Sequence, residues 1–302
     1  MNHDDPNPHD PQTVPGGFPE PASPATSSGL ADGGALDSGA PAEQQAIQND
    51  LLVPWTWTDI GLFAVFGLIG SLIVALTLAQ VAISVFGVAR SEVAASEPNA
   101  TKALLSIAIQ TVLSVLALLY LFFIVRTRSP APFWLAIGWR RLHPEGGLGA
   151  TAMRYIGAGA GLAILISLAG RLVAQPEELP IEQLFRSRSA VLFLMAFGIL
   201  IAPVVEETIF RGFLYPVIAR QFGMPAGVIL TGLLFGGVHA AQLWGGWGQI
   251  GLVMVVGIVL SWVRARTGSV TASYLMHLGY NSLLFLGFFA ATGGLRHIPG
   301  VE

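Results

Sequence analysis

Long runs of apolar residues, each about as long as a bilayer is thick, alternate with short polar loops from residue 59 onward. About 20 residues of α-helix cross the hydrocarbon core, so each run predicts a membrane-spanning helix. Seven spans are expected, at residues 59–86, 103–125, 155–173, 190–219, 225–242, 248–263 and 269–291. The fourth run is longer than a membrane is thick, so we expect a kink at Pro203 or a helix that projects beyond the bilayer. A break there would make eight spans in this all-α, polytopic transmembrane helix bundle.

Residues 1–50 lack the apolar pattern and are rich in Pro, Gly, Ala, Ser and Asp, with eight acidic residues and no Lys or Arg. Such a composition cannot bury enough apolar surface to offset the entropy of ordering. We therefore expect a disordered acidic tail over 1–50. It is followed by N-terminal transmembrane helices over 51–180 and a core over 185–291.

Two aromatic segments are predicted to lie at the membrane surface. Trp55 and Trp57 precede the first span, where tryptophan favours the interfacial belt. Residues 133–141 mix aromatic and basic side chains, a combination typical of a short interfacial helix.

The composition agrees with a membrane protein, because only 11% of the residues are charged, against about a quarter in soluble domains. The absence of cysteine excludes disulfides, thiolate catalysis and thiolate metal sites. The net charge of −3 gives no indication of nucleic-acid binding.

Arginines indicate the orientation of the bundle. Five of them lie in 126–154 and two in the turn 264–268, and the seven-span count puts both on one side of the membrane. The positive-inside rule makes that side cytoplasmic, together with the N-terminal tail, although basic residues on the opposite loops make the bias modest.

Three groups of polar side chains interrupt the last four apolar runs. A charged group at membrane depth costs roughly 2.5–3.5 kcal/mol on insertion scales, so such residues mark pairing, hydration or function. The groups are Glu206 with Glu207 and Arg211, His239 alone, and His277 with Asn281.

Helix geometry relates these groups to one another. Glu206 and His239 each lie about thirteen residues from the 220–225 turn, hence at similar depth in a helical hairpin. Glu207 and Arg211 are spaced i,i+4 and can pair, whereas Glu206 is rotated by about 100° from Glu207 and stays free for another role. The spacing allows a single site.

These residue types suffice for hydrolysis of an amide by water without a covalent intermediate. A glutamate can act as general base, a histidine can share the water, and a His/Asn pair can donate hydrogen bonds to a developing oxyanion. The sequence has no His-Glu-x-x-His, no Asp after Asp59 to form an aspartyl dyad, and no Gly-x-Ser-x-Gly within a span. Glu206, His239 and His277 could instead bind Zn²⁺, so a metal-dependent mechanism stays open beside the favoured metal-free one.

Simpler interpretations also exist. Glu207 with Arg211 can be a helix-stabilising pair, His239 a packed residue, and His277 with Asn281 a contact between helices. Taken together, the groups are also compatible with a proton-coupled transporter or an inactive membrane scaffold. The sequence lacks the internal repeat that is frequent in transporters.

The ordered motifs resemble those of the CPBP family of intramembrane proteases, which includes the CAAX-processing, Rce1-like enzymes and is also called the Abi domain. Glu-Glu-x-x-x-Arg corresponds to 206–211, Phe-x-x-x-His to 235–239, and His-x-x-x-Asn to 277–281. The resemblance covers about 185–290.

The resemblance implies an intramembrane glutamic endopeptidase of the bacterial plasma membrane, with a four-helix catalytic core that opens toward the cytoplasm. Its substrate would be a membrane-associated peptide or protein of the CAAX or leader/bacteriocin type. Members of the family have been described both with and without a metal, and we favour catalysis without a cofactor, with Zn²⁺ as the alternative. Glu206 and His239 would activate water, and His277 and Asn281 would form the oxyanion hole. The supporting residues would be Glu207, Arg211 and Phe235.

Overall fold

The computed structural model describes residues 50–94, 100–142, 147–174, 179–180 and 188–297, and in this part the chain forms helices and no strands. Six helical stretches are long and apolar enough to cross a membrane, which confirms the predicted polytopic bundle. They are α2 (Trp57–Ser84), α4 (Ala100–Arg128), α6 (Leu148–Gly170), the stretch Arg188–Phe222, α11 (Trp247–Thr267) and α12 (Val270–Ala291). The predicted fifth span is the shorter apolar helix α10 (Met224–Val238), and the connections contain α3 (Arg90–Ala94) and α5 (Phe133–Ala136).

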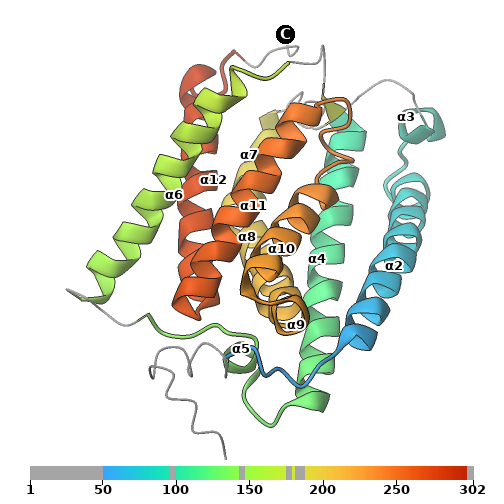
Figure 1. The fold of residues 1–302 in the computed structure, drawn as a ribbon. Helices are drawn as coiled ribbons and strands as arrows, with labels where there is room; N and C mark the ends of the chain where they lie inside the picture. The colour runs from blue at the N-terminus through green and yellow to red at the C-terminus, as the bar shows by residue number, and fades with distance from the viewer. Residues whose placement is uncertain (1–49, 95–99, 143–146, 175–178, 181–187, 298–302) are drawn as a thin grey trace, which may run out of the picture. The chain divides into compact units, whose positions relative to one another are not determined.

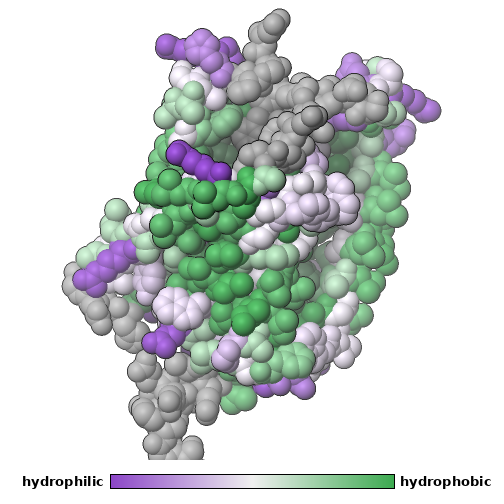
Figure 2. All heavy atoms as spheres, turned by 45° about the horizontal axis from the view of Figure 1, so that its top comes forward, coloured by the Kyte–Doolittle hydropathy of each residue, from purple (hydrophilic) through white to green (hydrophobic). Residues whose placement is uncertain are grey.

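Neighbouring helices pack in pairs along the bundle (Figure 1). Helix α2 packs on α4, α6 packs on α12, and α10 packs on α11. Large apolar side chains remain exposed on the outer helices, for example Leu68 on α2 and Leu165 on α6. Figure 2 shows such hydrophobic side chains over much of one face, with hydrophilic groups near its margins. Lipid tails can solvate this surface, whereas water would not.

Glycines allow two of these pairs to approach closely. A Cβ on Gly159 of α6 would lie 1.8 Å from the carbonyl oxygen of Met276 on α12. A Cβ on Gly232 of α10 would lie 2.5 Å from the backbone nitrogen of Ile258 on α11. Van der Waals packing of this kind associates helices in lipid, where the hydrophobic effect contributes little between them.

The predicted break at Pro203 is a local change of helix type. The stretch Arg188–Phe222 stays helical, and two π-helical segments separate its α-helical parts. In chain order these parts are α7 (Arg188–Ala196), η2 (Phe197–Ile201), α8 (Ala202–Glu207), η3 (Thr208–Leu214) and α9 (Tyr215–Phe222). Pro203 and Pro216 each follow a π segment, so the wider turn precedes the residue that cannot donate an N–H.

The residues before α2 pack against the core. Trp55 is fully buried, stacks on Phe213 with ring centroids 5.7 Å apart, and donates from Nε1 to the Phe213 carbonyl at 2.9 Å. Arg220 donates to the carbonyl of Val53 at 2.7 Å. The interfacial position predicted for Trp55 is therefore wrong, because its indole N–H has a protein partner; Trp57 remains 46% exposed.

Asp50 also departs from its prediction as part of the tail. Its carboxylate is buried and pairs with Arg140 at 2.9 Å and with Arg264. The residue is therefore part of the packed helical region, because two arginines neutralise its charge. Residues 1–49 lie outside the described residues.

The segment 133–141 forms one helical turn, α5, and then an irregular tether, so the predicted short helix is limited to Phe133–Ala136. Phe133 and Ile137 are buried in the core. The Gly138 carbonyl accepts a hydrogen bond of 2.9 Å from the Val270 N–H at the start of α12. This contact places the arginine-rich 126–142 segment beside the α11–α12 turn, as the seven-span count predicted.

Candidate active site

The three sequence motifs converge in one cavity, although they lie on separate helices. The cavity measures about 240 Å³ and is bordered by α8, α10 and α12, with further residues from α4 and α11. Five of the predicted site residues line it: Glu206, Phe235, His239, His277 and Asn281. The other two, Glu207 and Arg211, are fully buried beside it.

Glu207 and Arg211 form a buried ion pair, with Arg211 Nη1 2.9 Å from Glu207 Oε1. Arg211 Nη2 donates to the Gly257 carbonyl of α11 at 2.8 Å, and the guanidinium carbon lies 4.5 Å from the centroid of the Phe235 ring. Removing two charges from solvent is costly, and these additional contacts offset part of that cost. The pair therefore connects η3 to α10 and α11.

Glu207 also orients a histidine on α12. His277 Nδ1 lies 3.0 Å from the same Oε1 atom of Glu207 that Arg211 contacts. Because a carboxylate accepts, His277 donates from Nδ1, and its Nε2 points to Glu206, whose Oε2 is 3.7 Å away. Glu207 thus does more than stabilise its own helix, since it fixes the ring that faces the other glutamate.

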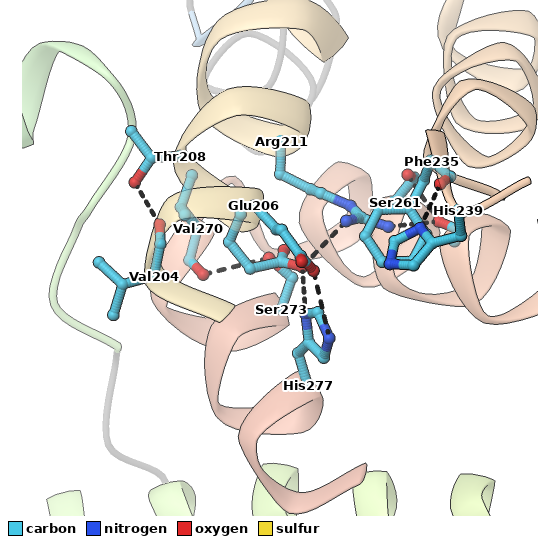
Figure 3. A network of polar contacts seen from close by, with 12 residues as sticks. Val204, Glu206, Thr208, Arg211, Phe235, His239, Ser261, Val270, Ser273 and His277 are labelled. Carbon is cyan, nitrogen blue, oxygen red and sulfur yellow. Dashed lines mark hydrogen bonds and ion pairs between the residues drawn. The ribbon is translucent and has the colours of Figure 1, made fainter. Parts of the chain in front are cut away.

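The backbone of α10 fixes the orientation of His239. The helix ends with a tight turn in which the His239 N–H donates to the Gly236 carbonyl at 3.1 Å. The Phe235 carbonyl instead lies 2.8 Å from His239 Nδ1 (Figure 3). A carbonyl can only accept, so Nδ1 carries the proton and Nε2 keeps a lone pair for a proton from water.

Pro203 determines the partner of Asn281. In η2 the Ala202 N–H donates to the Phe197 carbonyl five residues earlier. The next carbonyl in this series, that of Gly198, would accept from residue 203, but proline has no N–H. Asn281 Nδ2 donates to the Gly198 carbonyl at 2.7 Å instead. This bond turns the amide nitrogen toward η2 and leaves its second N–H for another acceptor.

A second cavity, of about 920 Å³, also borders Glu206 and His239. It lies between α2 and α4 on one side and the α8–η3 and α10 helices on the other. Its walls are mostly apolar and include Phe63, Leu113 and Leu234. An apolar chain segment beside Glu206 therefore has space in the described structure.

The alternative zinc ligands Glu206, His239 and His277 all line the cavity of about 240 Å³. Among the described residues, no three His, Asp or Glu side chains form a group that could hold a metal ion. The Nδ1 atoms of His239 and His277 already have Phe235 and Glu207 as partners, which leaves only Nε2 on each ring.

Several contributors to the site were not predicted from the sequence. Gly257 and Gly198 act through their carbonyls, which carry no side-chain signal. Trp139 donates to Thr208 Oγ1 at 3.0 Å and thereby ties the 133–141 tether to η3. Only the proline within an apolar run could have indicated a free carbonyl near residue 198.

Comparison with known proteins agrees with the motifs. Residues 188–283 match the family model of the "Type II CAAX prenyl endopeptidase Rce1-like" proteins. An "Uncharacterized 24.3 kDa protein" of Escherichia coli is 29% identical over 175 residues, which cover 56% of this chain and 76% of that protein. No solved structure matches. The matched segment contains all three motifs, and over these residues the chain is similar to the Rce1-like, CAAX-protease family.

Proposed function

We propose that this protein hydrolyses a peptide bond of a membrane-associated substrate, with water activated by Glu206 and His239. The observation that supports the proposal most strongly is the single cavity that collects Glu206, His239, His277 and Asn281 above a buried ion pair. The Glu206 side chain is 21% exposed, whereas that of Glu207 is 0% exposed. Only the first can reach a water and a substrate.

The reaction follows from the orientations of these groups. Glu206 takes a proton from water as His239 Nε2 holds the same water, and the oxygen attacks the carbonyl carbon of the substrate. The carbonyl electrons move to its oxygen, where the second Asn281 N–H and His277 stabilise the negative charge. His277 does so with both ring nitrogens protonated, so that Nδ1–H stays on Glu207 and Nε2–H reaches the oxyanion. The C–N bond then breaks, and the leaving nitrogen takes the proton from Glu206. The products are one carboxyl and one amino terminus.

The larger cavity supports an apolar, membrane-associated substrate. It provides about 920 Å³ beside Glu206 with few polar groups in its walls. A CAAX-like C-terminal tail and a leader or bacteriocin peptide both combine a cleavable main chain with an apolar portion. We propose that the substrates belong to this class. We also propose that the protein acts in the bacterial plasma membrane and that its site is accessible from the cytoplasm.

The test uses purified protein in phosphatidylethanolamine–phosphatidylglycerol vesicles and a quenched fluorogenic peptide carried on a lipid anchor. Wild-type protein should release fluorescence, and Glu206→Gln should not. Glu92→Gln, on the short helix α3 outside the cavities, is the matched control and should remain active. Equal cleavage by wild type and Glu206→Gln would contradict the mechanism. Proton uptake into the vesicles without any cleavage would favour a transporter.

A further inference from the structure

The two cavities beside α8 share four lining residues, and all four are polar. Glu206 and His239 are two of them, and the others are Gln110 and Gln242. The remaining walls of the larger cavity are mostly apolar. The two glutamines thus lie where the candidate catalytic cavity meets the space for the substrate.

Gln110 is an unusual residue for its position. It lies in the interior of α4, an apolar candidate span, and outside the family segment 188–283. Ser114 Oγ donates to its backbone carbonyl, but the Gln110 carboxamide makes no hydrogen bond to another described residue. A polar group at membrane depth is costly unless it is satisfied or used, and Gln110 lines both cavities.

Gln242 reaches the same junction from the turn that follows α10. Its backbone N–H donates to the His239 carbonyl at 3.0 Å, so the turn holds it next to the histidine. Its carboxamide also has no partner among the described residues. Two unpaired carboxamides therefore border the reacting centre from different elements.

A carboxamide matches a peptide group, because each has an N–H donor and a carbonyl acceptor. An extended peptide in an apolar cavity leaves its main-chain N–H and C=O groups unsatisfied at considerable cost. Glu206, His239, His277 and Asn281 are assigned to the water and the oxyanion, so they leave the flanking peptide groups without partners.

We infer that Gln110 and Gln242 bind the main chain of the substrate on either side of the scissile bond. The inference rests on the proposed function and extends it to substrate positioning. These hydrogen bonds involve only main-chain groups of the substrate, so the site can bind peptides with varied apolar side chains. It also requires the substrate to be extended, because the peptide groups of a helix are already hydrogen-bonded to one another.

The test combines enzyme variants with a modified substrate. Gln110→Leu and Gln242→Leu remove the carboxamides and suit an apolar wall, and Gln80→Leu on α2 is the matched control, since Gln80 is exposed and lies outside both cavities. The probe is the anchored fluorogenic peptide, unmodified or N-methylated at one peptide nitrogen next to the scissile bond. Each cavity variant should lower kcat/KM by about tenfold for each lost hydrogen bond, and Gln80→Leu should not.

N-methylation distinguishes binding of the main chain from a structural role. Methylation of the contacted nitrogen should slow wild type about tenfold but should have little further effect on the variant that lacks its partner. The inference would be overturned if methylation lowered kcat/KM by the same factor in wild type and in both variants. Full activity of both variants on the unmodified peptide would also overturn it. Those results would leave the proposed function intact, provided that Glu206→Gln abolishes cleavage. Cleavage that survives in Glu206→Gln would overturn the proposed function itself.

Discussion

Glu206 and Glu207 are adjacent on α8 but lie in opposite environments. Glu207 has two close partners, Arg211 in the same helical stretch at 2.9 Å and His277 on α12 at 3.0 Å. Glu206 borders both cavities, and its carboxylate lies farther from His277, at 3.7 Å. The comparison indicates that one carboxylate maintains the arrangement of the helices and the other is available for chemistry. Four experiments test this division.

The largest effect on activity is expected from Glu206→Gln. General acid–base catalysis contributes about 10²–10⁴-fold, so kcat should fall by that range. Thermal unfolding in detergent should be nearly unchanged, because Glu206 is partly exposed and makes no short ion pair. A large loss of stability would show that the two glutamates are both structural and would break the comparison.

The largest effect on stability is expected from Glu207→Leu. It leaves Arg211 buried without its carboxylate, which costs about 3–5 kcal/mol in comparable buried pairs. The double variant Glu207→Leu/Arg211→Leu should lose less, because no charge then remains uncompensated. Unfolding in mixed detergent micelles measures both variants. Equal stability of wild type and Glu207→Leu would contradict the assigned role of the pair.

An intermediate effect on activity is expected at Asn281, because this residue has a structural contact, to the Gly198 carbonyl, and a proposed chemical role at the oxyanion. Asn281→Asp removes the donor to the Gly198 carbonyl and to an oxyanion, and loss of one such donor costs about 10²–10³-fold in kcat. Pro203→Ala offers a milder control. The substitution restores a backbone N–H at residue 203 that can donate to the Gly198 carbonyl. Asn281 is then retained but competes for the acceptor that orients its side chain. Single-turnover kinetics should rank wild type first, then Pro203→Ala, then Asn281→Asp; an inactive Pro203→Ala with a normal Asn281→Asp would reverse the argument.

The smallest effect is expected from chelation. If Glu206 acts directly on water, exhaustive treatment with EDTA and 1,10-phenanthroline should leave the cleavage rate unchanged. Loss of activity that Zn²⁺ restores would instead assign Glu206, His239 and His277 to a metal. Metal analysis of the purified protein provides an independent measurement.

The sequence predicted which residues would meet, because polar side chains are rare in its apolar runs. Glu206 and His239 could be placed at similar depth from residue counts alone, and the structure brings both to one cavity with His277. The contact of His277 with Glu207 could not be predicted, since it depends on the rotation of α12 about its axis. The sequence also could not decide the environment of Trp55, because an aromatic residue near the end of a span is compatible with both the membrane interface and the protein core.

Backbone partners were even less accessible to sequence reasoning. The Gly198 carbonyl becomes an acceptor only because η2 is a π segment and Pro203 follows it. Gly257 accepts from Arg211 at 2.8 Å across two elements, a contact that depends on how η3 packs beside α11. Neither residue has a side chain that would have drawn attention to it.

The two π segments have a consequence for how this site can change. A π turn contains one residue more than an α turn, so η2 and η3 act as single-residue insertions on both sides of the six-residue α8. Deletion of one residue from η2 would rotate α8 by about 100° relative to α7, which is the angle between neighbouring residues. The helix then presents a different residue to the cavity while its ends remain packed. Length changes in this region therefore reassign the residue that faces the substrate.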